Sequence, residues 1–300
     1  MKITIAVVCA LGAAFCFALG SLLQQGAARQ SAEGALRFRL LLALLHDRRW
    51  LAGVALSVSS FLILGTALAF GPLSLVQPLV ATEIVIALPL IARRNKRPLT
   101  RKDALGALTV AAGMAVFIAV SPPLSGVVQP AVAAWIPAFI GIGALMAVAG
   151  AASLRARGVA RVIWLAVAAG AVYGLLDALA KSSVGVLQTR GLGAVVTTWE
   201  PYALLGAGLL GGLFGQSAFG AGPLSLSLPV IDTLEPIAAV VLATTVFRER
   251  LASSPWQLAL QLAGGVLAVA GIAVLSHSSI VSTEFRTQPA GGQPGESAAG

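Results

Sequence analysis

Charged residues are scarce in this chain. Only 10% of its 300 residues are Asp, Glu, Lys or Arg, whereas an average soluble domain has about 25%. Hydrophobic residues make up 58% of the chain, and the mean hydropathy is +0.92. Several apolar runs reach the ~20 residues that an α-helix needs to cross a bilayer. The composition therefore excludes an ordinary soluble domain and predicts an all-α, polytopic membrane protein with nine or ten transmembrane helices.

Residues typical of enzyme active sites are equally sparse. The two histidines, His46 and His277, lie near the edges of apolar runs, and Cys9 and Cys16 lack metal-ligand spacing. The sequence has no Walker motif, so we do not expect ATP to be the direct energy source. We expect no enzymatic activity and no cofactor, while metal binding stays undetermined.

The basic residues are unevenly distributed along the chain. The formal net charge is +9, and 15 of the 20 lysines and arginines lie in three loops and the C-terminal tail. This is the positive-inside pattern of membrane proteins and does not resemble a nucleic-acid-binding face. With nine helices, it predicts that the C-terminus lies in the cytoplasm and the N-terminus outside. We expect the protein in the plasma membrane.

The apolar runs predict nine helices, at roughly 3–25, 50–70, 73–93, 102–121, 131–152, 161–181, 199–220, 223–247 and 256–276. A shorter apolar patch at 36–46 lies between the first two. It is shorter than the ~17 residues that a membrane span requires. We interpret it as an interfacial or re-entrant segment, with a short tenth helix as the alternative. That alternative would put both chain ends in the cytoplasm.

One short sequence motif occurs twice in the chain. The sequence GPLSL at 71–75 is followed by Pro78, and GPLSL at 222–226 is followed at the same distance by Pro229. Four predicted helices on each side match at this offset, and the helix at 131–152 is left as a connector. Two four-helix units joined by one helix must lie upside down relative to each other, which is the inverted repeat of many transporters.

This repeat predicts the organisation of the chain. We expect a first transmembrane repeat at 1–121, a connecting helix and loops at 122–160, and a second repeat at 161–276. The tail at 277–300 is rich in polar residues and glycine, so it is expected to be disordered.

Acidic residues lie deep inside both repeated segments. Glu83 lies in the first segment, and Asp232 and Glu235 lie in the second. A carboxylate in hydrocarbon is costly and by default marks a functional site. Asp232 and Glu235 are three residues apart and therefore share a helix face. We expect the three acids to bind a coupling ion or cationic substrate near the midplane; neutralisation by a neighbouring helix without a transport role is the alternative.

Prolines accompany these acids. Pro78 and Pro229 each lie about one turn before an acid, and Pro236 directly follows Glu235. Because proline lacks an N–H, it frees a carbonyl group four residues earlier in its helix. We expect these three prolines to shape the site.

Two further pairs of polar residues are candidates for the site. Asp177 and Lys181 are four residues apart, so they either pair with each other near a helix end or line the cavity of the second half. Gln24 and Gln25 occupy the corresponding end of the first helix. They offer polar contacts to a substrate.

These motifs resemble the drug/metabolite transporter superfamily, of EamA type. The resemblance rests on the repeated GPLSL motif, on Glu235-Pro236 and on FRERL at 247–251. WLAG at 50–53 and AFGPLSLV at 69–76 also resemble the magnesium-transporter branch called NIPA. The resemblance covers most of residues 1–276 and implies an alternating-access carrier with its cavity between two inverted halves. In the first half, RPL at 97–99 replaces the acidic turn of the superfamily.

The sequence thus predicts a secondary transporter of a small solute, either a metabolite or a drug-like compound, driven by a proton or cation gradient. A divalent-cation carrier for magnesium and a non-transporting membrane scaffold or accessory subunit are the alternatives. The expected partners are the small-molecule or cation substrate and the lipid bilayer, without nucleic acid. A homodimer is left open.

Overall fold

Helices make up the regular structure of this protein. The computed structural model describes residues 2–31, 35–70, 79–80, 82–96, 98–120, 127, 129–248 and 254–277, and no strand occurs among them. The helices are α1 (Lys2–Gln30), α2 (Phe38–Leu44), α3 (Arg48–Phe70), α5 (Glu83–Arg94), α6 (Arg101–Ala119), α7 (Val132–Arg155), α8 (Gly158–Arg190), α9 (Leu192–Val195), α10 (Glu200–Ala221), α11 (Leu224–Thr245) and α12 (Pro255–Ser276).

Many of these helices are suited to a bilayer. Seven of the described helices, namely α1, α6, α7, α8, α10, α11 and α12, are long and apolar enough to cross a membrane. Large hydrophobic side chains point outward from the bundle, and Leu62, Leu154 and Val266 each have at least 70% of their surface exposed. Such exposure is unfavourable in water and favourable in lipid. The chain is therefore a multi-pass helical membrane protein.

The predicted helices are largely confirmed, with two differences. α8 does not end near residue 181 but continues to Arg190, where Gly191 ends it at a φ of 80°. Asp177 and Lys181 therefore lie well inside a 33-residue helix and not near its end. Glu83 is the first residue of α5 and not a mid-helix residue. The first GPLSL motif, Pro78 and residues 278–300 of the C-terminal tail lie outside the described residues.

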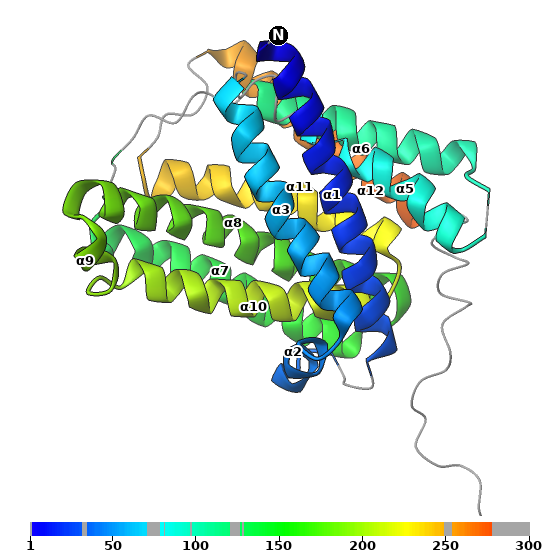
Figure 1. Ribbon diagram of the computed structural model, residues 1–300, viewed down its shortest axis with the longest axis horizontal. Coiled ribbons are helices and arrows are strands. Elements are labelled where there is room, and N and C mark those ends of the chain that lie inside the picture. The colour runs from blue at the N-terminus through cyan, green and yellow to red at the C-terminus, as the bar shows by residue number, and fades with distance from the viewer. Residues whose placement is uncertain are drawn as a thin grey trace, which may run out of the picture.

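The patch predicted at 36–46 contains α2, a helix of seven residues. It is too short to cross a bilayer and packs near α10 at the end of α1 (Figure 1).

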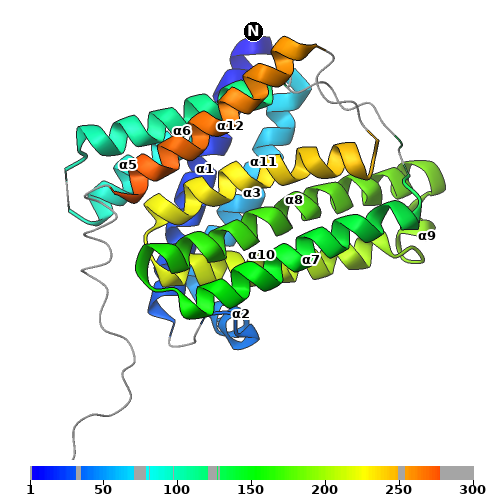
Figure 2. The same ribbon diagram turned by 180° about the vertical axis from the view of Figure 1, so that it is seen from behind.

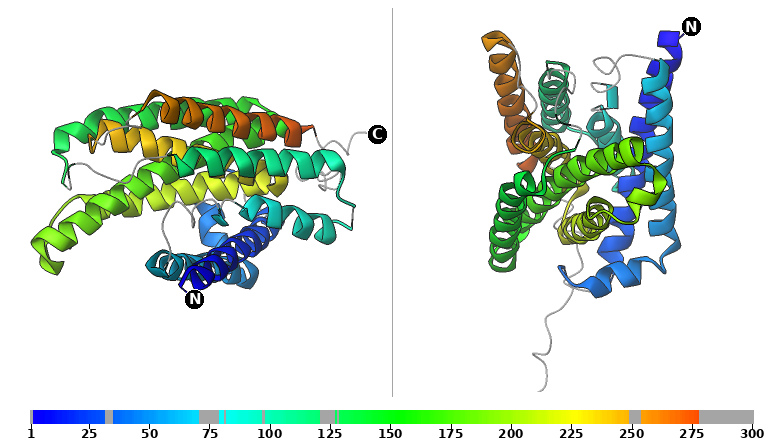
Figure 3. Two further views of the ribbon diagram at one scale, coloured as in Figure 1. Left: turned by 90° about the horizontal axis from the view of Figure 1, so that it is seen from above. Right: turned by 90° about the vertical axis from the view of Figure 1, so that its left-hand side faces the viewer.

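The helices pack as two groups that cross at a steep angle. α1 and α3 lie side by side and run across the others (Figures 1 and 3). α8 packs against α7, α10 and α11, while α6 and α12 form a pair on the other side of α11 (Figure 2). α11 thus lies between the α8 group and the α6–α12 pair.

Small residues permit these close contacts. α1 buries a run of alanines, including Ala6, Ala10 and Ala18. On α6, a Cβ added at Gly113 would lie 2.5 Å from the backbone nitrogen of Ala268 and 2.6 Å from the carbonyl oxygen of Gly264 on α12. Small residues at such positions let helix backbones approach in a membrane, where the lipid supplies no hydrophobic force between helices.

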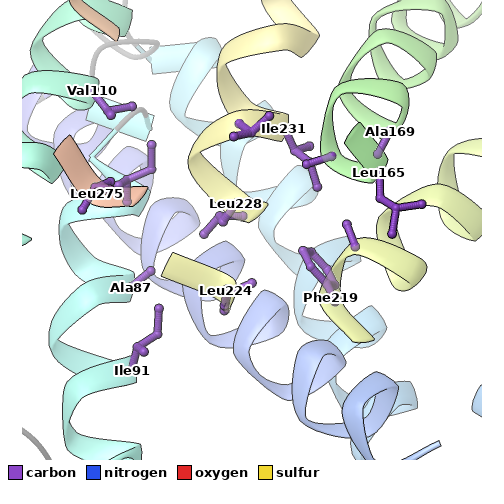
Figure 4. Packing of buried hydrophobic residues seen from close by; sticks show 14 of the residues in the cluster. Ala87, Ile91, Val110, Leu165, Ala169, Phe219, Leu224, Leu228, Ile231 and Leu275 are labelled. Carbon is purple, nitrogen blue, oxygen red and sulfur yellow. The ribbon is translucent and has the colours of Figure 1, made fainter. Parts of the chain in front are cut away.

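The first half of α11 forms the centre of the core. Leu224, Leu228 and Ile231 project from it toward α5, α8 and α10 (Figure 4). Every residue from Leu224 to Ile231 is buried, including the serines and Pro229. Because α11 is fixed on several sides, the acids that follow on it are held inside the bundle.

Candidate functional site

Four acidic side chains from three helices are linked by a series of electrostatic interactions. Glu83 begins α5, Asp177 lies on α8, and Asp232 and Glu235 lie on α11. The charges of Asp232 and Glu235 act on Glu83, and those of Asp177 and Asp232 act on Glu235. Glu83 is buried, and Ser21 of α1 hydrogen-bonds its side chain. We call these four acids the acidic cluster.

Glycines of α8 hold α11 in place beside the acids. A Cβ added at Gly174 would lie 2.6 Å from the carbonyl oxygen of Glu235, and one at Gly170 would lie 2.9 Å from that of Ile231. Any larger residue would push the two backbones apart. The turn that carries Asp232 and Glu235 is therefore fixed against α8.

Two of the three predicted site-shaping prolines lie inside α11. Pro229 and Pro236 do not interrupt this helix, which continues from Leu224 to Thr245. Since proline has no N–H, Pro229 and Pro236 cannot donate to the carbonyl groups four residues earlier, those of Ser225 and Asp232. The prolines therefore loosen the hydrogen bonding of α11 next to the acids without breaking it.

Tyr173 of α8 borders the acidic cluster, and sequence reasoning missed it. Its ring lies across Gly211 and Gly215 of α10, where a Cβ at Gly215 would be 2.6 Å from the tyrosine hydroxyl oxygen. The charges of Glu235 and Asp232 act on Tyr173. A four-residue spacing of glycines favours close helix contacts, but nothing in the sequence identifies Tyr173 as the partner.

The predicted pair Gln24 and Gln25 belongs to a hydrogen-bond network between helices. Gln24 Nε2 donates to Ser57 Oγ of α3 at 3.0 Å, and Gln216 Nε2 of α10 donates to Gln24 Oε1 at 2.8 Å. Gln25 Nε2 donates to the carbonyl oxygen of Gly222 at 2.9 Å, and Arg94 of α5 donates to Gln25 Oε1. We call Gln24, Gln25, Ser57, Arg94 and Gln216 the amide network. Arg94 and Gln216 were not expected as site residues.

The amide network and the acidic cluster are neighbours along α1. Ser21, which hydrogen-bonds Glu83, is three residues before Gln24 and four before Gln25. Residues three or four apart lie on one helix face, about one turn or 5.4 Å from each other. The site therefore has an anionic part and a neutral polar part.

Lys181 lies one turn beyond Asp177 on α8. Its Nζ is 4.5 Å from the centre of the Phe247 ring, a cation–π contact. Phe247 packs edge to face on Trp135, which also contacts Trp199. Lys181 therefore meets an aromatic cluster at the end of α11, at the margin of the acidic cluster.

The geometry assigns no metal site. Among the described residues, no group of three His, Cys, Asp or Glu side chains is close enough to hold a metal ion. The acids attract a cation but are spread over three helices.

Replacing Gln25 with leucine should destabilise the protein. Gln25 is fully buried and hydrogen-bonds both Gly222 and Arg94. Leucine would leave a buried carbonyl group without its donor, which costs about 1–3 kcal/mol. Thermal unfolding in detergent would measure the loss. Gln30→Leu, at the exposed end of α1, is the control and should leave the unfolding temperature unchanged.

These features define a multi-pass helical membrane protein with a cluster of acids inside its bundle. No family model matches the chain, and no solved structure matches it. The chain is 32% identical over 291 residues to the "Uncharacterized protein Cgl0250/cg0304" of Corynebacterium glutamicum, and the match covers 96% of this chain and 97% of that protein. The chain belongs to the same family as that protein.

Proposed function

We propose that this protein is a secondary transporter of a small solute, a metabolite or drug-like compound, in the plasma membrane. The acidic cluster carries this proposal, because acids inside a membrane bundle typically bind coupling ions or cationic substrates. The adjacent amide network supports it, since binding a small organic molecule needs directional polar contacts besides charge. No catalytic step is proposed.

We further infer that the chain is built from two inverted repeats and works by alternating access, as in the EamA-type drug/metabolite transporters. The helix pairs support this inference. α1 packs along α3, and their counterparts in the second half, α8 and α10, pack along each other in the same way. α6 and α12, the last helices of the two halves, pack against each other. In transporters of this kind the substrate site lies at the interface between the repeats. The interaction of Glu83, in the proposed first repeat, with Asp232 and Glu235, in the proposed second repeat, supports such a site.

A magnesium carrier is the second candidate. The four carboxylates of the acidic cluster favour it, because hard divalent cations prefer oxygen ligands. It requires the acids to come closer together than they do in this conformation, since no three described acids are close enough to hold a metal ion.

Flux measurements in liposomes test both candidates. Internal pH and internal magnesium would be recorded together under imposed gradients, for the wild type and for Asp232→Asn. Proton movement that depends on an added solute, and that Asp232→Asn abolishes, is the expected result. Magnesium influx lost in the variant would identify a magnesium carrier. If neither signal appears over a broad panel of solutes, or if the variant equals the wild type, the proposed function is wrong and a non-transporting scaffold is favoured.

A further inference from the structure

Gln216 of α10 has an unsatisfied acceptor inside the protein. Only 3% of its surface is exposed. Its Nε2 donates to Gln24 Oε1 at 2.8 Å, while its own Oε1 has no hydrogen-bond partner among the described residues. A buried acceptor without a donor is unfavourable, and native proteins rarely keep one without a reason. The oxygen is therefore available to a donor that the described residues do not provide.

Two independent contacts place Gln216 beside the acidic cluster. Along α1, its partner Gln24 lies one turn from Ser21, which hydrogen-bonds Glu83. Along α10, Gln216 directly follows Gly215, against which the hydroxyl end of Tyr173 packs. The charges of Glu235 and Asp232 act on that same tyrosine. Both routes link Gln216 to the acids through neighbouring side chains, Gln24 and Ser21 in one case and Tyr173 in the other.

The two parts of the site separate two kinds of ligand. A bare cation at the acids leaves the Gln216 oxygen unused, because it carries no hydrogen-bond donor. An organic cation that also has a hydroxyl or N–H group uses both. Its positive charge meets the carboxylates, and its donor meets the amide oxygen.

We propose that Gln216, held in place by Gln24, selects organic cations that carry a hydrogen-bond donor besides the positive charge. This inference rests on the proposed function and specifies its substrate class. Gln24 orients the amide of Gln216 through its own oxygen, and Ser57 in turn holds the Gln24 amide nitrogen. This series of hydrogen bonds from α3 through α1 to α10 fixes which end of the Gln216 amide faces the ligand.

Two matched probes test the inference on the purified full-length protein. 4-Aminobutan-1-ol carries an ammonium group and a hydroxyl at the far end, and n-pentylamine has a methyl group in place of that hydroxyl. Affinity is measured from ligand-dependent thermal stabilisation. We expect the wild type to bind the amino alcohol roughly three- to tenfold more tightly, the contribution of one hydrogen bond. In Gln216→Leu this preference should disappear while the affinity for n-pentylamine is retained.

Control variants separate this effect from a general loss of packing. Gln261→Leu removes another buried glutamine, on α12, and should keep the preference. If Gln216→Leu does not fold, Gln216→Met, which retains the side-chain length, repeats the test.

Three results would overturn the inference: equal binding of the two probes by the wild type, binding of neither probe, or a preference that survives in Gln216→Leu. The proposed function is decided separately by the acid variants. If Asp232→Asn still transports as the wild type does, the proposed function is wrong. If only the Gln216 preference is missing, the transporter proposal stands and its substrate class is different.

Discussion

Glu83→Gln is expected to lower transport at least about 30-fold without unfolding the protein. Glutamine keeps the size of the side chain and an oxygen that can accept the hydrogen bond from Ser21, but it removes the negative charge. Removing one partner of a buried charge pair, here the carboxylate that meets the transported or coupling cation, costs about 2–5 kcal/mol. This corresponds to a factor of about 30 or more in the affinity for the cation. Because Asp232 and Glu235 act on Glu83 with charges of the same sign, removing one charge should leave stability unchanged or raise it.

The measurement is solute flux in liposomes per folded molecule, together with thermal unfolding in detergent. Asp103→Asn is the matched control, because Asp103 is also fully buried but belongs to a capping box at the start of α6. Its Oδ2 accepts hydrogen bonds from the backbone nitrogen of Thr100 at 2.8 Å and from Thr100 Oγ1 at 2.7 Å. This variant should lose about 1 kcal/mol of stability and retain its flux. Full flux in Glu83→Gln would contradict the role given to the acidic cluster.

Gly113→Leu is expected to destabilise the fold by about 3 kcal/mol or more. Gly113 of α6 touches the backbone of α12, and a Cβ there would lie 2.5 Å from Ala268 N and 2.6 Å from Gly264 O. These are main-chain atoms, so they move only if α6 and α12 separate. The same contact recurs further along the pair, where a Cβ at Gly271 would lie 2.7 Å from the backbone nitrogen of Val110.

Gly141→Leu on α7 is the matched control for this prediction. Gly141 is exposed, and a Cβ there would meet nothing within 4 Å. Leucine also favours the helix over glycine by about 0.5–1 kcal/mol, so this variant should be as stable as the wild type or slightly more stable. The unfolding temperature and the yield of folded protein in detergent would distinguish Gly113→Leu from Gly141→Leu. Equal loss in both variants would mean that the α6–α12 contact does not depend on glycine.

Much of the fold could be predicted because membrane helices have a strong local signal. About 20 consecutive apolar residues can satisfy their backbone groups in lipid only as a helix. The ends were less predictable. α8 continues past Lys181 because no proline interrupts it, and its one glycine in this stretch, Gly185, is buried within the helix. The helix ends only at Gly191. Glu83 begins α5, although the apolar run that contains it starts earlier.

The candidate site was predictable only in part. Glu83, Asp232 and Glu235 stood out because charge is rare in an apolar run. Tyr173, Arg94 and Gln216 did not, because a tyrosine or glutamine in a helix, or an arginine at its end, is ordinary until its neighbours are known. Lys181 was expected to pair with Asp177 or to line a cavity, and its ammonium group lies over the Phe247 ring.

The sequence by itself determined that this protein is a helical membrane protein with acids inside its apolar segments. Both properties follow from local composition and from the cost of charge in hydrocarbon. The tertiary structure alone decided which helices meet. It brought Asp177 of α8 to Glu235 of α11, and Gln216 of α10 to Gln24 of α1, across long stretches of chain. Those contacts depend on glycines that let helix backbones approach, and the fit between two distant surfaces is not encoded in either segment alone.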